Sequence, residues 1–423
     1  MKFVYTAQNV PKGVIPAPAL GLLEQLSGFS QKTSGEYKEQ IEVLRVPFDG
    51  MMLSESSRMA QKMNTSSLRV VFVVGIGGSS LGTRAITEAL NTRGKFTEIV
   101  FLESLSGHKL SEIQARCMSL HSADEFVINI ISKAGATTET IANFSILTNF
   151  LSHISGWQKR VVVTTTSSSE LAKLAQAEKY ELLYMPQVIS GRYSVFTPVG
   201  LFPLVLCGYP VQDILEGARD VQQLLNSPHD PTRRLVEDIL GSMQNGGHII
   251  DFFFFNAELE DLGKWGRQLY AESLGKTFDR SGREVHTGIT PTVSIGSEDL
   301  HSMVQLYYGG PRDRITLLLP PLGGDKHVVP HHPFTKLVPG IDSRTTDEIN
   351  TAIYTGVAAA FRSNKIPFGE ATFPGLNAHM IGAFMQWQMQ TVATLAEALN
   401  ICAFDQPNVE DYKKVTHSLL LRN

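Results

Sequence analysis

Cysteine is scarce in this chain of 423 residues, which contains only Cys117, Cys207 and Cys402 and no CxxC pair. Such widely spaced thiols argue against a disulfide scaffold and a cysteine-ligated zinc site, and they favour a reducing compartment. No apolar run reaches the ~18 residues that a membrane-spanning helix needs. No apolar signal core follows Met1. We therefore expect a cytoplasmic protein that has no membrane segment.

An excess of charge of one sign is also missing, because 37 Lys and Arg residues face 41 Asp and Glu residues, a formal net charge of −4. This balance provides no basic field for nucleic acid or for an anionic membrane, so an anionic ligand has to be captured locally. The composition, 43% hydrophobic and 18% charged, is that of a globular protein. The length exceeds one ordinary core and favours two domains.

Strand and helix patterns alternate along the chain, which predicts an α/β fold with mostly parallel sheets. Strands are expected at residues 68–74, 126–131, 160–164, 248–255, 291–295 and 315–319. Helices are expected at about 259–273, 298–308, 345–363 and 376–400, and from Leu171, where Ser167 to Glu170 has the pattern of a capping box. Both halves of the chain follow the same order of strand, loop and helix.

Two similar domains are therefore expected, one at residues 1–195 and one at residues 196–423. The segment 191–209 is expected to join them. Residues 320–339 are rich in Pro, Gly and His, which predicts an irregular surface excursion. The four phenylalanines at 252–255 are expected in a buried strand and not in an aromatic binding platform.

Two loops that each follow a strand and precede a helix are rich in glycine and hydroxyl groups. Glycines let backbone N–H groups approach an anion, and a helix N-terminus adds a favourable dipole. Each loop alone could also be a plain turn, with Thr137 or Thr138 as a helix cap. Two such loops at the carboxyl ends of strands in one sheet favour a phosphate site. The candidate binding residues are Gly78, Ser79, Ser132, Lys133, Ala134 and Thr137.

Other phosphate-binding patterns fit this sequence less well. A dinucleotide fingerprint, GxGxxG, requires glycine where the chain has Ser80. No GK[ST] follows the first loop, so the P-loop pattern is absent as well. A dinucleotide-dependent oxidoreductase is therefore the least favoured alternative.

Six segments, in order along the chain, resemble signatures of the phosphoglucose isomerase family. They are GIGGSSLG at 75–82, SKAGATT at 132–138, SGRYS at 190–194, QLYAESLGK at 268–276, DLHS at 299–302 and FDQPNVEDYK at 404–413. The resemblance implies two sugar-isomerase-type αβα sandwich domains. It also implies interconversion of glucose 6-phosphate and fructose 6-phosphate through a cis-enediol(ate), a reaction that requires no metal and no redox cofactor.

The resemblance also implies a role for each matching residue. Glu272 is the expected base for the carbon proton, and Gln268 lies one helical turn before it. Arg192 is expected to stabilise the enediolate oxygen, because its charge is permanent and its guanidinium is rigid. His301 is expected to assist ring opening, since imidazole exchanges protons near neutral pH. Lys413 is expected to contact the ring-opening oxygens together with His301. Gln268 and Gln406 are expected to order the substrate or the base.

Two features depart from the family pattern. Ala134 and Ala136 stand where relatives carry Ser or Thr, so the second loop loses hydroxyl donors. Asn408 replaces a glycine, and Asn tolerates a left-handed backbone better than other residues do. The spacing of His327, His331 and His332 is loose and offers no fourth ligand, so we expect no metal site there.

The family usually forms a homodimer in which the neighbouring subunit supplies the histidine, so His301 is expected to act in trans. Two alternatives stay open on sequence grounds. A broader isomerase that also accepts mannose 6-phosphate would carry the same motifs. A non-catalytic sugar-phosphate sensor would keep the loops, although the presence of Glu272, Arg192 and His301 disfavours it.

Overall fold

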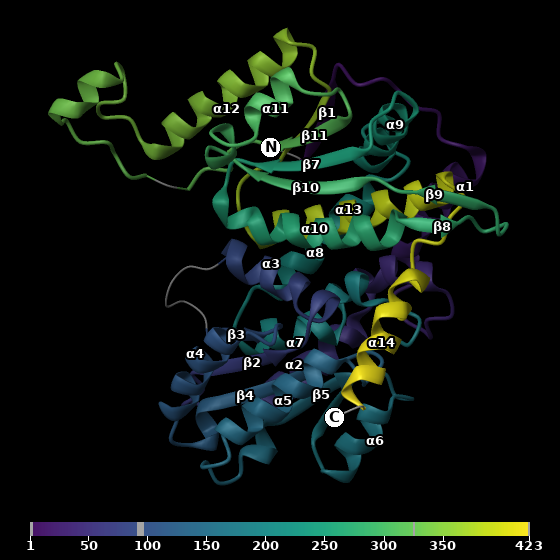
Figure 1. Ribbon diagram of the computed structural model, residues 1–423, viewed down its shortest axis with the longest axis vertical. Coiled ribbons are helices and arrows are strands. Elements are labelled where there is room, and N and C mark those ends of the chain that lie inside the picture. Colours follow the sequence, from purple (N-terminus) through teal and green to yellow (C-terminus); the bar gives the residue numbers. More distant parts are fainter. Residues whose placement is uncertain (1–2, 91–96, 325, 422–423) are drawn as a thin grey trace. The chain divides into compact units, whose positions relative to one another are not determined.

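The computed structural model describes residues 3–90, 97–324 and 326–421 (Figure 1). These residues form two compact units. The N unit consists of Gly28–Gln223 and Asn377–Gln386. The C unit combines the described residues of Met1–Ser27, Leu224–Leu376 and Trp387–Asn423. Within the described residues, no helix has both the length and the apolar character of a membrane span.

This division differs from the expected boundary after residue 195. The first segment belongs to the C unit because β1 (Val4–Gln8) pairs antiparallel with β12 (Phe368–Thr372). The segment 191–209 is not a linker but part of the N unit, where it forms the 3-10 helix η6 (Gly191–Phe196) and helix α7 (Pro198–Leu206). Its apolar side chains are almost all buried, so they pack into a core instead of connecting two cores.

The N unit is built on a five-stranded parallel sheet in the order β3-β2-β4-β5-β6. The strands are β2 (Val70–Val74), β3 (Glu98–Leu102), β4 (Phe126–Ile131), β5 (Val161–Thr165) and β6 (Glu181–Tyr184). Every residue of the three central strands is buried, as expected for a sheet covered on both faces. One face packs on Ile113, Cys117, Leu147 and Leu171.

The helices of the N unit follow the strands in sequence, except for α2, which precedes β2. They are α2 (Gly50–Met63), α3 (Leu81–Leu90), α4 (Gly107–Met118), α5 (Thr138–Phe150), α6 (Glu170–Ala177), α7 and α8 (Val211–Gln223). Helix α6 begins at Glu170, and the Ser169 hydroxyl caps it by accepting a hydrogen bond from the Ala172 N–H at 3.0 Å. The capping box expected from Ser167 is therefore wrong, because Glu170 is the first helical residue and cannot reach back as the third.

The C unit contains a second five-stranded sheet, in the order β1-β12-β11-β7-β10. Strands β7 (Ile249–Phe254), β10 (Thr290–Ile295), β11 (Arg314–Leu319) and β12 are parallel, and β1 is the antiparallel edge. A separate hairpin pairs β8 (Lys276–Phe278) with β9 (Glu284–Thr287). Phe252 to Phe255 are all buried, which confirms the expected core strand.

The helices of the C unit are α1 (Ala17–Ser27), α9 (Pro231–Gln244), α10 (Glu260–Leu274), α11 (Val304–Gly309), α12 (Thr346–Ser363) and α14 (Glu410–Leu420). Helix α14 buries none of its residues and so does not cover the sheet. Helix α13 (Ala378–Ala398) begins in the N unit and continues into the C unit. The cluster around Phe253 and Phe255 packs on α11 and α12.

Helix α10 packs on the other side of the same strands, next to Phe252 and Phe254. At Gly263 an added Cβ would lie 2.6 Å from Val293 Cγ1 and 2.9 Å from the Phe254 ring, so only glycine permits this close approach. The Tyr270 hydroxyl donates to Gln388 Oε1 at 2.7 Å. Helix α10 is therefore fixed along its length.

The expected strands of both units are confirmed, and so are the helices at 259–273, 345–363 and 376–400. The helix expected at 298–308 is confirmed only in its second half, as α11, because its first part forms a 3-10 turn, η8 (Glu298–Leu300). The Asp299 carboxylate accepts from the Ile295 N–H at 2.7 Å and from the Ser302 hydroxyl at 2.6 Å, which holds the chain in a turn. The excursion after β11 is irregular and exposed, as expected.

Candidate active site

The two loops of the N unit follow strands β2 and β4, which are parallel neighbours in the sheet. Both loops therefore leave the sheet at the carboxyl ends of their strands, where α/β proteins bind ligands. The first loop turns through η3 (Gly77–Ser79), with Gly77 at a φ of 60°. The second passes Gly135, at a φ of 79°, and enters α5.

In the second loop, the hydroxyls of Ser132 and Thr137 are hydrogen bonded to each other at 3.0 Å, and the Gly135 N–H donates to Ser132 Oγ at 3.1 Å. Thr137 occupies the N-cap position of α5, yet its side chain makes no cap hydrogen bond. The expected N-cap position of Thr137 is therefore confirmed, but its hydroxyl bonds to Ser132 and not to a helix N–H. Ala134 and Ala136 are exposed, and their methyl side chains add no hydrogen-bond donor to the loop.

Arg192 lies beside the first loop because Gly78 and Gly191 touch through their backbones. A Cβ built on Gly78 would lie 2.1 Å from the Gly191 carbonyl carbon and 2.5 Å from the Arg192 nitrogen. The Ser194 hydroxyl bonds the Gly191 carbonyl at 2.7 Å and the Gly78 carbonyl at 3.3 Å. Gly78, Ser79 and Arg192 are thus one structural group.

Positive charge gathers near these loops. Arg192 is almost fully buried. Burial lowers the pKa of the Lys133 ammonium, and the nearby Arg192 guanidinium lowers it further. A bound anion near these two cations compensates their charge, which suits a phosphate monoester.

Glu103, which the sequence pattern does not indicate, supports the first loop. Its carboxylate accepts from the Ser80 hydroxyl at 2.6 Å and forms an ion pair with Arg84 at 2.5 Å. Ser80, the residue that breaks the dinucleotide pattern, therefore anchors the loop. Glu103 comes directly after β3, at the same edge of the sheet as the two loops, and this position could have indicated it. Strand β3 is half-exposed, so the apolar pattern of the sequence does not reveal the strand.

In the C unit, Gln268 and Glu272 lie on the same face of α10, as their spacing predicts. Gln268 Nε2 donates to Glu272 Oε1 at 2.9 Å. Within the described part of the chain, the buried Gln268 Oε1 has no hydrogen-bond donor. An unsatisfied buried acceptor is costly, so this oxygen is available to a ligand hydroxyl. Glu272 itself is half-buried.

His301 and Lys413 are not hydrogen bonded to the Gln268–Glu272 pair. His301 is exposed in the turn after η8, and no residue in ranges 3–90, 97–324 and 326–421 hydrogen bonds to its ring. Lys413 lies on α14, where its ammonium pairs with Glu410 at 2.8 Å. Gln406 is exposed just before α14. The structure thus groups Gly78, Ser79 and Arg192, and separately Gln268 and Glu272.

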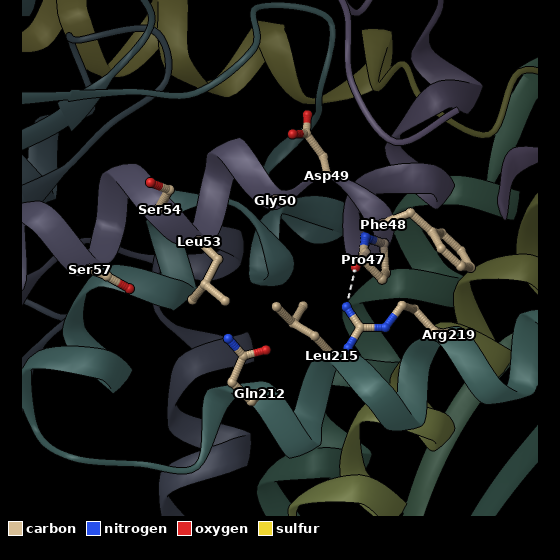
Figure 2. A pocket seen from close by; sticks show the side chains of 10 residues that line it. All are labelled: Pro47, Phe48, Asp49, Gly50, Leu53, Ser54, Ser57, Gln212, Leu215 and Arg219. Atoms are coloured by element: carbon tan, nitrogen blue, oxygen red, sulfur yellow. Dashed lines mark hydrogen bonds between the residues drawn. The ribbon is translucent and has the colours of Figure 1, made fainter. Parts of the chain in front are cut away.

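A cavity of about 360 Å³ in the N unit contains none of these residues (Figure 2). Arg219 crosses it and donates to the Pro47 carbonyl at 3.1 Å, while the Asp49 carboxylate caps α2 by accepting from the Met51 N–H at 2.9 Å. The Asp49 carboxylate already occupies the N-terminus of α2, and its negative charge repels a phosphate there. We therefore do not assign a sugar phosphate to this cavity.

The histidines of the surface excursion have other contacts. His331 lies 3.6 Å from Asp342, and His332 Nδ1 accepts from the Phe334 N–H at 3.3 Å. Among the described residues, no three His, Cys, Asp or Glu side chains form a group that could hold a metal ion.

Two α/β units with mostly parallel sheets, and anion-suited loops at the carboxyl ends of neighbouring strands, define a protein of the sugar-isomerase type. The chain belongs to the phosphoglucose isomerase family, because the family's model matches residues 54–320. A glucose-6-phosphate isomerase from Leptospira interrogans is 32% identical over 403 residues, which cover 92% of this chain and 88% of the relative.

Solved structures share the fold. A hypothetical protein from Thermus thermophilus superimposes with a TM-score of 0.83 at 26% identity, over 95% of both chains. A glucose-6-phosphate isomerase from Chlamydia trachomatis superimposes with a TM-score of 0.77 at 17% identity, over 93% of this chain and 77% of its own. The resemblance noted from the six sequence segments is therefore confirmed at the level of family and fold.

Proposed function

We propose that the protein is a glucose-6-phosphate isomerase, which interconverts glucose 6-phosphate and fructose 6-phosphate in glycolysis and gluconeogenesis. The observation that carries the proposal is the Gln268–Glu272 pair, in a chain that belongs to the phosphoglucose isomerase family. A carboxylate held by an amide, beside a free amide oxygen, suits proton transfer next to substrate hydroxyls.

Glu272 takes the proton from C2 of the open-chain aldose. The electrons of the C2–H bond form the C1–C2 double bond, and the C1 carbonyl oxygen becomes the enediolate oxygen. The Arg192 guanidinium stabilises this negative charge without changing its own protonation. Glu272 then returns the proton to C1, while the proton of the C2 hydroxyl passes to the C1 oxygen, so that C1 carries the alcohol and C2 the ketone.

The phosphate group is captured in the N unit by Ser132, Lys133 and Thr137, by the backbone of Ala134 and by the loop of Gly78 and Ser79. The base, the histidine and the C-terminal lysine are supplied by the C unit. Because Ala134 and Ala136 lack hydroxyls, backbone N–H groups and the Lys133 ammonium provide most of the phosphate contacts. Gln406 assists Gln268 in holding the sugar.

Ring opening of the closed sugar precedes isomerisation, and His301 moves the proton to the ring oxygen with the help of Lys413. We propose that His301 acts on the substrate of a second copy of the chain, in a cytoplasmic homodimer. The exposed imidazole, which has no hydrogen-bond partner in the described chain, supports this role. Dilution below the dimer dissociation constant then lowers the specific activity, whereas a monomeric enzyme keeps it.

The test mixes the purified protein with fructose 6-phosphate and a chelator, without nucleotide, and follows glucose 6-phosphate with a coupled enzyme. The matched control is Glu272→Gln, which keeps the shape and the Gln268 contact but removes the base. We expect turnover by the wild type and a loss of roughly 10²–10⁴-fold in the variant. Binding of fructose 6-phosphate without any wild-type turnover refutes the enzyme and favours the sensor.

A further inference from the structure

Lys276, the last residue of the QLYAESLGK segment, is a buried cation. Its side chain is only 4% exposed, although it stands at the start of the short strand β8. A buried ammonium is costly unless hydrogen-bond acceptors surround it. The identity of those acceptors therefore indicates what Lys276 does.

The acceptors come from two segments that are far apart in the sequence. Lys276 Nζ donates to the backbone carbonyl of Glu272 at 2.7 Å and to the backbone carbonyl of Asp405 at 3.0 Å. It also lies 3.4 Å from Asp405 Oδ1. One ammonium thus binds the residue proposed as the base and the residue just before Gln406.

The Glu272 carbonyl lies in the last turn of α10, which ends at Leu274. Carbonyls at the end of a helix commonly depend on side chains or water for a donor. A lysine that binds such a carbonyl also interacts favourably with the negative end of the helix dipole. Lys276 therefore fixes the backbone from which the Glu272 side chain projects.

A second contact supports the same junction. Asn408 Nδ2 donates to Thr277 Oγ1 at 2.8 Å, which aligns residues 405–408 with the start of β8. Asn408 is the residue that departs from the family's glycine, and its side chain makes this contact possible. The segment that carries Gln406 is thus held to the segment that follows Glu272.

We propose that Lys276 is a positioning residue that sets the placement of Glu272 and of Gln406 together, an inference that rests on the proposed isomerase function. It does not touch the reacting atoms. Replacing it with methionine removes the ammonium that binds both carbonyls, which allows both segments to shift. A displacement of about 1 Å at a reacting group costs roughly 10²-fold in rate.

The test compares Lys276→Met, Lys276→Arg and a control, Lys264→Met, in steady-state isomerisation of fructose 6-phosphate. Lys264 lies on the same helix, where its ammonium forms ion pairs with Glu260 at 2.8 Å and Asp261 at 3.1 Å, at the opposite end from Glu272. We expect Lys276→Met to lower kcat about 10²-fold with KM changed less than about threefold. Lys276→Arg keeps a charged donor and restores kcat to within about tenfold of the wild type. Lys264→Met keeps the wild-type kcat.

A double-mutant cycle with Gln406→Ala separates positioning from general destabilisation. If Lys276 places Gln406, the loss caused by Gln406→Ala is smaller in the Lys276→Met background than in the wild type. If Lys276→Met gives no folded protein, Lys276→Gln, which retains an N–H donor, takes its place in the cycle.

Failure of the proposed isomerase function can be distinguished from failure of the Lys276 role. An inactive wild type refutes the isomerase function and the Lys276 role with it. An active wild type overturns the Lys276 role alone if folded Lys276→Met keeps kcat within threefold, if Lys276→Arg is as slow as Lys276→Met, or if the cycle is additive.

Discussion

Gly78 allows the sharpest test of how the N unit assembles its site. A Cβ on Gly78 would lie 2.1 Å from the Gly191 carbonyl carbon, whereas a Cβ on Gly191 would lie 3.5 Å from the Gly78 Cα. A methyl group on Gly78 therefore clashes with Gly191, whereas a methyl group on Gly191 fits beside Gly78. Gly78→Ala and Gly191→Ala form a matched pair.

The magnitude follows from the overlap. Ordinary contact begins at 3.4 Å, so Gly78→Ala has to move the two backbones apart by about 1.3 Å. Overpacking of this kind costs roughly 1–3 kcal/mol, or about 2–4 °C in Tm for each kcal/mol in a unit of this size. Because Arg192 follows Gly191 directly, the separation also displaces its guanidinium, and kcat/KM falls about 10²-fold.

Calorimetry and the coupled isomerase assay measure both effects. We expect Gly191→Ala to stay within about 0.5 kcal/mol of the wild type, the usual range for substitutions without a clash. The reasoning is refuted if Gly78→Ala keeps its Tm and a kcat/KM within threefold of the wild type, or if the two variants behave alike.

Three further outcomes test other parts of the site and of the fold. Arg192→Ala should lower kcat by roughly 10²–10³, the range for one lost electrostatic donor, and turnover within threefold of the wild type contradicts that role. Ala134→Thr should lower KM for fructose 6-phosphate roughly 2- to 10-fold, the value of one added hydrogen bond, and an unchanged KM shows that the backbone amides suffice. Hydrogen bonding from the His121 N–H, with Arg69 and Ser122, lowers the pKa of Glu125 to about 2. A depressed carboxyl pKa stabilises the fold above its unfolded value of about 4.3, and this contribution is lost as the pH falls toward 2. In urea titrations Glu125→Gln should therefore be less stable than the wild type at pH 7 and equal to it near pH 2; an equal deficit at both values refutes the assignment.

The central strands could be predicted from the sequence because they are apolar on both faces, as in β2 and β4. Strands β3 and β6 could not, because they are half-exposed edges with a weak apolar pattern. Strand β12 contains Gly369, over which the Tyr5 ring packs so closely that a Cβ would lie 2.4 Å from the Tyr5 hydroxyl. Tyr5 belongs to β1, more than 360 residues earlier, so the local sequence around Gly369 does not indicate this packing.

In the candidate site, too, contacts between residues far apart in the sequence could not be predicted from local patterns. The Gln268–Glu272 contact follows from helical spacing alone, and it was predictable. The contact of Gly78 with Gly191 and the bonds from Lys276 to Asp405 join residues more than a hundred positions apart. Contacts of this kind depend on how the elements pack, so a motif can name the residues but not the atoms that join them.

The pairing of β1 with β12 has a consequence for synthesis on the ribosome. Strand β1 is synthesised roughly 360 residues before its partner, β12. At about 5–20 residues per second, β1 waits roughly 20–70 s with its hydrogen-bonding edge open. Most of the N unit, by contrast, is complete by Gln223 and lacks only the ten residues from Asn377. A chain stalled before Phe368 thus presents β1 as an unpaired strand, whose open edge can pair with other chains.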